Sequence, residues 1–224
     1  AGWNGGIKFN QLYPDRIYYE NTMVPLVLFY TLKSMEFKGR VISMMASCAY
    51  DGEKDEIPQE ANPLDGKPND SVACHGYAKR NAYLMANYVK PALDVGLICP
   101  GTVYGPGDKL DPDRTKVMMS LIKKFVDATK AGDEIVTIWG SGLPIREFIY
   151  VKDLAKEIVD HLELDRFPLL TQVPGYSSSI KELAERIASI VGQMKKRFTH
   201  TNYSYDKYFK GLMETIRWYE NLVS

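Results

Sequence analysis

The sequence has few cysteines and no long apolar run, and each shortage excludes a class of protein. Three cysteines, Cys48, Cys74 and Cys99, occur among 224 residues. An odd number at wide spacing fits neither a disulfide framework nor the paired Cys-x-x-Cys of a zinc site, so we expect reduced thiols and no metal. The longest strongly apolar run, 24–30, is far shorter than the roughly 20 residues of a membrane span, and no signal sequence opens the chain. We therefore expect a cytoplasmic protein that does not bind membranes.

The chain also lacks an excess of charge of either sign. Lysine and arginine together number 28, as do aspartate and glutamate, which gives a formal net charge of zero. A neutral chain has no general attraction for nucleic acid, so nucleic acid is not an expected partner. Hydrophobic residues make up 45% and charged residues 25% of the chain, which is typical of a folded, soluble protein.

Helical and strand patterns alternate along the chain, which predicts the α/β class with a parallel sheet. Helices are predicted over 18–35, 72–89, 117–130, 181–191 and 210–222, and strands over 40–46, 94–99, 134–139 and 147–151. Asn21-Thr22 is a candidate start for the first helix. The stretch 51–71 is too polar to pack and is predicted to be a surface loop. A Gly/Pro-rich turn, 100–108, follows the strand 94–99 at the edge where open α/β sheets place their ligands.

Several segments resemble the extended short-chain dehydrogenase/reductase (NAD-dependent epimerase/dehydratase) family, and within it the GDP-L-fucose synthase branch. The resemblance covers nearly the whole chain. It rests on Ala1–Ile7, on Ala46-Ser47-Cys48-Ala49-Tyr50, on Gly76-Tyr77-Ala78-Lys79-Arg80, on Pro100–Gly107, and on Trp139-Gly140-Ser141-Gly142 with Arg146-Glu147-Phe148.

The resemblance implies a Rossmann-like, doubly wound parallel sheet whose first strands precede this chain. Residues 1–108 would form part of that core, and 109–224 a small α/β substrate-binding lobe interleaved with the last core strands at about 147–160. It implies NADP(H) as cofactor and a GDP-sugar as substrate, although the sequence contains no G-x-x-G-x-x-G turn. The cofactor contacts would come from Lys79, Pro100, Thr102 and Val103, and the substrate contacts from Val117, Lys124, Trp139 and Arg146.

Catalytic roles carry over by the same resemblance, with substitutions. The family's reduction uses a serine, a tyrosine and a lysine four residues after the tyrosine; Lys79 matches the lysine, His75 stands at the tyrosine position and Ala46 at the serine position. Tyr77 cannot replace the tyrosine, because two residues along a helix turn a side chain by about 200°. For epimerisation, Cys48 matches the family's cysteine, and Lys116 stands where the family has its acid histidine.

These residues leave three hypotheses for the function. The first is a nucleotide-sugar epimerase/reductase that converts GDP-4-keto-6-deoxymannose to GDP-L-fucose with NADPH, with Cys48, His75, Lys79 and Lys116 as catalytic residues. The second is a catalytically silent relative that binds a nucleotide sugar or acts as a scaffold, in which Cys48 is a small core residue and His75 a polar residue at a helix start. The third is a fragment whose exposed sheet edge pairs with another chain. The family's architecture also implies a homodimer built from the helices 18–35 and 72–89.

Overall fold

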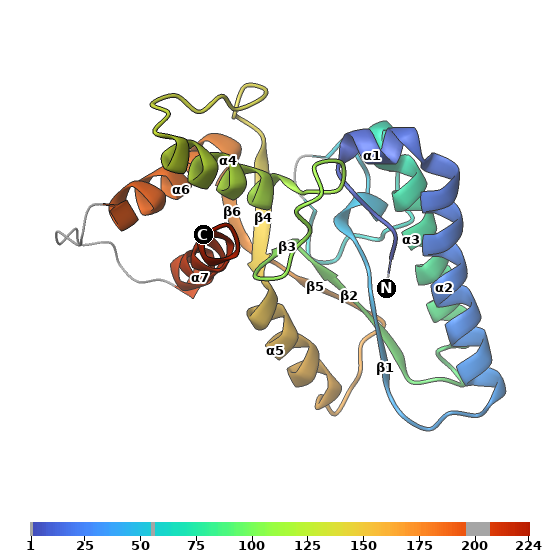
Figure 1. The fold of residues 1–224 in the computed structure, drawn as a ribbon. Coiled ribbons are helices and arrows are strands. Elements are labelled where there is room, and N and C mark those ends of the chain that lie inside the picture. The colour runs from blue at the N-terminus through green and yellow to red at the C-terminus, as the bar shows by residue number, and fades with distance from the viewer. Residues whose placement is uncertain (1, 55–56, 196–206) are drawn as a thin grey trace. The chain divides into compact units, whose positions relative to one another are not determined.

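The computed structural model describes residues 2–54, 57–195 and 207–224, and it divides into two compact units (Figure 1). Unit 1 comprises 1–100 and 154–173, and unit 2 comprises 101–153 and 174–224. The helices are α1 Ile7–Leu12, α2 Pro14–Ser34, α3 Ala73–Val89, α4 Val117–Ala131, α5 Val151–Leu162, α6 Ile180–Lys195 and α7 Lys207–Leu222, with short 3-10 helices η1 Ser47–Ala49 and η2 Asp70–Val72. The strands are β1 Val41–Met44, β2 Val95–Pro100, β3 Thr102–Tyr104, β4 Ile145–Tyr150, β5 Leu170–Val173 and β6 Tyr176–Ser179.

Unit 1 contains a parallel sheet in the order β1-β2-β5, as the alternating pattern predicts. The central strand β2 is buried along five of its six residues, which explains its continuous apolar sequence. Helices α2 and α3 lie side by side (Figure 1), and the core between helices and sheet includes Phe29, Ala86 and Leu97. The carboxyl ends of the three parallel strands therefore lie at one edge of the sheet. The chain continues from β1 into η1 at this edge.

Two boundaries in unit 1 differ from the prediction. The strand predicted over 40–46 is β1 Val41–Met44, and it is half-buried rather than buried because, in the described chain, it pairs with β2 alone. The helix expected to begin at Asn21 begins at Pro14, a residue whose fixed φ and missing N–H suit the first helical position. Asn21 is buried inside the helix instead, where its side-chain amide donates to the Trp3 carbonyl at 2.8 Å.

Unit 2 is built around a mixed three-stranded sheet. Strand β4 pairs in parallel with β3 and antiparallel with β6. Helices α4, α6 and α7 enclose one apolar cluster, to which Ile122, Phe148, Ile187 and Ile216 contribute fully buried side chains. The predicted strand at 147–151 is thus β4 and belongs to this second sheet, whereas β5, which the sequence pattern did not reveal, completes the sheet of unit 1.

The strand predicted over 134–139 is wrong. The burial of the segment alternates, with Val136 and Ile138 half-buried between exposed neighbours, but it forms no strand. Ile138 packs against the unit 2 core, and the Thr137 carbonyl accepts a hydrogen bond from Lys124 Nζ at 3.1 Å. The apolar alternation therefore reflects docking on a helical core rather than pairing in a sheet.

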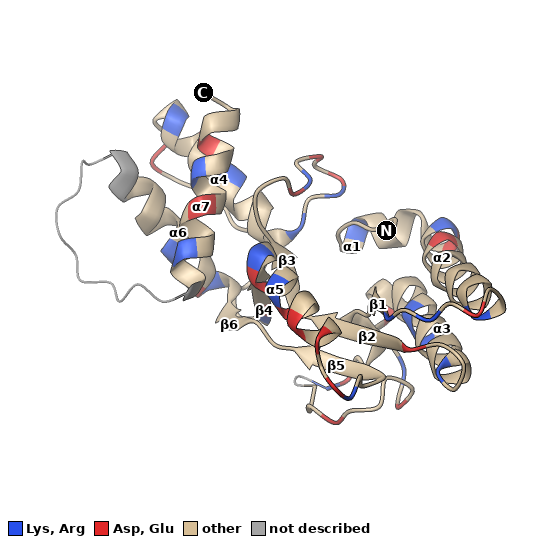
Figure 2. Cartoon of the chain, turned by 90° about the horizontal axis from the view of Figure 1, so that it is seen from below, with Lys and Arg blue, Asp and Glu red and all other residues tan. Residues whose placement is uncertain are grey.

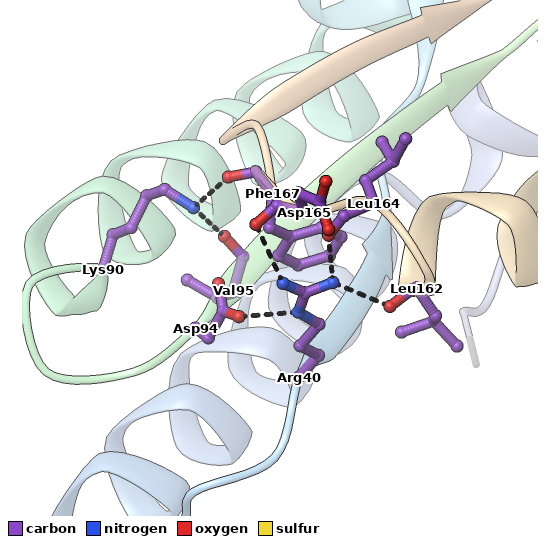
Figure 3. A network of polar contacts seen from close by, with 8 residues as sticks. All are labelled: Arg40, Lys90, Asp94, Val95, Leu162, Leu164, Asp165 and Phe167. Carbon is purple, nitrogen blue, oxygen red and sulfur yellow. Dashed lines mark hydrogen bonds and ion pairs between the residues drawn. The ribbon is translucent and has the colours of Figure 1, made fainter.

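Arg40 fastens the segment between α5 and β5 to the start of β1 (Figure 3). Its Nε lies 2.9 Å from Asp94 Oδ2, and its guanidinium donates to the carbonyl oxygens of Leu162, Leu164 and Asp165. Lys90 Nζ supports the same turn by donating to the carbonyl of Phe167 at 3.0 Å and to that of Val95 at 2.8 Å. Because that segment leads into β5, Arg40 holds the third strand of the sheet in place.

Replacing Arg40 with alanine is expected to lower the free energy of unfolding by about 2 kcal/mol. The substitution removes four hydrogen-bonding contacts and leaves carbonyl oxygens of the turn without a donor. Urea unfolding followed by circular dichroism measures the change. Lys67→Ala, which removes only the exposed 3.7 Å pair with Asp70, is the control and should shift stability by less than about 0.5 kcal/mol; equal effects of the two variants would contradict this role of Arg40.

Basic and acidic residues are interspersed along helices such as α5 and α7 (Figure 2), in keeping with the balanced net charge. In the part of the chain that the structure describes, no helix is long and apolar enough to cross a membrane.

Candidate active site

Helix α3 carries two of the predicted catalytic residues on one face. His75 and Lys79 are four residues apart in α3, so their side chains stack one turn above the other. His75 is buried and Lys79 is half-buried. Tyr77 is exposed, as the 200° rotation between positions 75 and 77 predicts.

Cys48 is brought to this face by the close approach of η1 to α3. A Cβ added to Gly76 would lie 2.4 Å from the Cys48 carbonyl oxygen, so only glycine at position 76 lets the two segments meet. The buried Arg80 reinforces the contact: its Nε donates to the Ala49 carbonyl at 2.7 Å, and its other nitrogens donate to carbonyls of the loop 64–66. Arg80 therefore ties the loop predicted over 51–71 to helix α3, next to the contact between η1 and α3.

Cys48 and His75 form a thiol–imidazole pair. Cys48 Sγ lies 3.4 Å from His75 Nδ1. Burial raises the pKa of the Cys48 thiol to about 12, against an ordinary value of 9.0, while the nearby Lys79 ammonium opposes that shift. At neutral pH the thiol keeps its proton, so a basic role for Cys48 needs a partner that accepts this proton, and Nδ1 is the acceptor in contact with it.

Lys79 is held at the carboxyl end of β1. Its Nζ donates to the Met44 carbonyl at 2.8 Å. Burial lowers the pKa of Lys79 below its ordinary value of 10.5, and interaction with Cys48 acts in the opposite direction. The ammonium thus lies where it favours negative charge on the Cys48 sulfur.

Two asparagines that the sequence analysis did not single out complete the site. Asn4 Nδ2 lies 3.4 Å from His75 Nδ1, and Asn4 Oδ1 accepts hydrogen bonds from the Gly5 N–H at 2.8 Å and from Asn10 Nδ2 at 3.3 Å. Asn10 is buried in α1 and also donates to the carbonyls of Gly5 and Gly6. No sequence signal connects Asn4 with a histidine 71 positions later, because only the packing of α1 against η2, which directly precedes α3, brings them together.

The family's serine position has no hydroxyl. Ala46 is half-buried in extended backbone, with φ −150° and ψ 144°, directly before η1. Ser47 is exposed. The site therefore unites Cys48, His75 and Lys79 with Asn4, and it contains no equivalent of the serine.

The predicted cofactor residues other than Lys79 follow β2. Pro100 is its last residue, and Thr102 and Val103 are half-buried in β3. The carboxyl ends of parallel strands are where open α/β sheets bind ligands, and Lys79 and Pro100 both lie at such ends. In the described ranges, no group of histidine, cysteine and acidic side chains is arranged to hold a metal ion.

The remaining predicted site residues belong to unit 2. Lys116 precedes α4 and Val117 is its first residue; both are half-buried. Lys124 Nζ lies 5.5 Å from the ring centroid of Trp139, whose side chain is 85% exposed. Arg146, in β4 opposite Ser178, is exposed and donates to the neighbouring Ile145 carbonyl at 2.7 Å. Unit 2 thus brings Lys124 and Trp139 together and leaves the Arg146 guanidinium open to solvent.

Comparison with known proteins places these features in a family. The family model described as "NAD dependent epimerase/dehydratase family" matches residues 1–166. GDP-L-fucose synthase of Escherichia coli is 28% identical over 200 residues, which cover 84% of this chain and 62% of the relative. Probable GDP-L-fucose synthase 1 of Oryza sativa is 27% identical over 247 residues, covering 98% of this chain and 74% of the relative. The chain therefore spans about three fifths of the length of the bacterial relative.

The solved structures agree at the level of the fold. A GDP-L-fucose synthetase from Naegleria fowleri, crystallised with NADP, superposes with a TM-score of 0.76 at 17% identity. The match covers 100% of this chain and 76% of that protein. This agreement confirms the predicted Rossmann-like α/β class.

Proposed function

Because the chain belongs to the NAD-dependent epimerase/dehydratase family, we propose that it is a nucleotide-sugar epimerase/reductase of the GDP-L-fucose synthase type, acting on GDP-4-keto-6-deoxymannose with NADPH. The observation that carries this proposal is the union of Cys48, His75 and Lys79 at the end of β1. These are three positions at which the family's catalytic groups stand, and the fold brings all three to one face of α3.

In the reduction, His75 would take the part of the tyrosine. An imidazole titrates near neutrality and can deliver a proton to the oxygen of the sugar's 4-keto group as that oxygen gains negative charge. Lys79 supplies positive charge one helical turn away. When bound, the nicotinamide cofactor would supply the hydride for the carbonyl carbon.

In the epimerisation, Cys48 would be the base. The His75 Nδ1 takes the thiol proton, and the resulting thiolate, stabilised by the Lys79 charge, removes a proton from the carbon next to the keto group. By the family resemblance, Lys116 stands at the position of the acid that returns a proton in this step.

The residues present fit the nicotinamide end of NADP(H). Lys79, Pro100, Thr102 and Val103 would contact the nicotinamide part, at or just beyond the ends of β1 and β2. The glycine-rich turn that binds the pyrophosphate in Rossmann folds does not occur in this sequence.

Turnover of the 4-keto sugar with NADPH tests the proposed function. Appearance of GDP-L-fucose with one NADPH oxidised for each sugar supports the enzyme. The substitutions at Ala46, His75 and Lys116 favour the second candidate, a silent relative, which predicts binding of GDP without NADPH oxidation at any pH. Fluorescence titration with NADPH on a sample of verified intact mass separates the two, because saturable NADPH binding belongs to the enzyme alone.

Replacing Arg146 with alanine is expected to weaken GDP binding by about tenfold or more. We assign the exposed guanidinium to the diphosphate, and a charge-assisted bidentate contact has an energy of about 1.5 kcal/mol or more. Isothermal titration calorimetry with GDP measures the change. Arg217→Ala, at another exposed arginine of unit 2, is the matched control; equal affinities for the two variants would contradict the role of Arg146.

We also infer a homodimer formed through α2 and α3. Besides the side that packs in unit 1, α2 has a second apolar face at helical spacing, formed by Tyr19, Met23, Val27 and Tyr30, whose exposures run from 40% to 65%. On α3, Tyr77 and Tyr88 are also exposed. Exposed apolar faces of this kind are typical of helix-to-helix association.

Val27→Glu is expected to raise the dimer dissociation constant by at least about tenfold, because the carboxylate would enter an apolar interface once from each subunit. Sedimentation velocity over a range of concentrations measures it. Ile135→Glu replaces another exposed apolar residue outside this face and should leave the dissociation constant unchanged. A parent protein that stays monomeric at high concentration would contradict the homodimer.

A further inference from the structure

We propose that Asn4 is a positioning residue: its side-chain amide fixes the neutral His75 ring in the tautomer whose proton is on Nε2. The functional meaning of this inference rests on the proposed function, but the inference itself concerns the state of the ring. The argument has three steps, each resting on contacts within unit 1.

The orientation of the Asn4 amide is settled by its neighbours. Asn4 Oδ1 accepts from the Gly5 N–H, which can only donate, at 2.8 Å. Asn10 Nδ2 also donates to this oxygen, and Asn10 is oriented in turn by the carbonyls of Gly5 and Gly6, which can only accept. The other end of the Asn4 amide, the NH₂ group, must therefore face His75.

An NH₂ group determines what the facing ring nitrogen can be. Asn4 Nδ2 lies 3.4 Å from His75 Nδ1, and an amide nitrogen donates and does not accept. A proton on Nδ1 would point at another donor, so the neutral ring carries its proton on Nε2.

The Cys48 thiol is compatible with this tautomer. Its Sγ lies 3.4 Å from the same Nδ1, and burial keeps the thiol protonated, so the thiol can donate to a bare Nδ1. With the Asn4 NH₂ group fixing Nδ1 as an acceptor, this nitrogen is ready to receive the Cys48 proton. On the proposed function, the Nε2–H bond breaks as the sugar oxygen gains its proton, the S–H bond breaks as Nδ1 gains one, and the negative charge moves from the oxygen to sulfur beside the Lys79 ammonium.

Nitrogen-15 NMR of histidine-labelled protein tests the tautomer directly. The spectrum is recorded at a pH at which the ring is neutral, and the His75 signals are assigned by their loss in His75→Gln, which leaves His161 and His200. The parent is expected to show a bare Nδ1 and a protonated Nε2. In Asn4→Asp, a carboxylate that can only accept faces Nδ1, and the tautomer is expected to reverse. The matched control, Asn81→Asp, makes the same change on α3 at a residue whose amide donates to Tyr18, and should leave the His75 signals unchanged.

A protonated Nδ1 in the parent overturns the proposal. An unaltered tautomer in folded Asn4→Asp does the same. Should that variant fail to fold, Asn4→Ala removes the donor without adding charge and is expected to give a mixture of both tautomers; an unmixed Nε2–H ring there also overturns it. The readout needs no turnover, so a chain inactive toward the sugar can still confirm the tautomer, and an active one can still refute it.

Discussion

Replacing Lys79 with methionine is expected to lower kcat by about 10²- to 10⁴-fold, the range in which loss of one acid–base group usually falls. The ammonium lies one turn from His75 and interacts with Cys48, so its removal affects both proton transfers of the proposed reaction. Methionine keeps the length of the side chain and avoids the cost of burying a charge. The free energy of unfolding should therefore fall by only about 1 kcal/mol, because one hydrogen bond, to the Met44 carbonyl, is lost. Thermal unfolding measures this change.

The pH profile distinguishes this electrostatic role from a structural one. Burial lowers the pKa of Lys79, so its positive charge, fully present at low pH, is lost as pH rises through a value below 10.5. The alkaline limb of kcat is accordingly expected below pH 10.5. In Lys79→Arg the charge persists to higher pH, so the limb should move upward even where the poorer geometry of the guanidinium lowers kcat. An unmoved limb in the arginine variant would contradict the role of Lys79.

Periodicity located the elements that bury an apolar face and missed those defined by long-range pairing. Helix α3 and strand β2 match their predicted ranges within one residue, because 3.6-residue spacing and a continuous apolar run are local signals. Strand β5 is four residues long, and what makes it a strand is its pairing with β2, about 70 positions earlier in the chain. The same reasoning accounts for 134–139, whose strand-like alternation comes from contact with a core.

Register along one helix predicted the centre of the site, and packing decided the rest. Counting four residues back from Lys79 was enough to place His75 beside it, since helix geometry fixes that spacing. The approach of Cys48 depends on Gly76. The sequence contains this glycine, but only the structure shows that a Cβ at position 76 would lie 2.4 Å from the Cys48 carbonyl oxygen. Asn4 depends on a turn of chain before α1, and for that contact the sequence contains no local indication.

Restoring the family's residues at positions 75 and 46 gives the second large expected effect. The double variant Ala46→Ser, His75→Tyr is expected to raise kcat for the reduction by about 10²-fold. A tyrosine at 75 lies one turn before Lys79, whose charge lowers the phenol's pKa and makes it a proton donor. A serine at 46 follows β1 in extended backbone and supplies a hydroxyl at the family's serine position, whereas Ser47 begins η1 and its side chain is exposed. Single-turnover oxidation of NADPH measures the steps up to hydride transfer without the contribution of product release.

Two variants control for the hydroxyl and for the position. His75→Phe fills the same space without a proton donor and should be less active than the parent, whereas Tyr77→Phe removes an exposed hydroxyl from the other side of α3 and should leave kcat unchanged. If the double variant matches the parent in rate, His75 is not the proton donor. The Cys48–His75 contact would then have to be explained by packing alone.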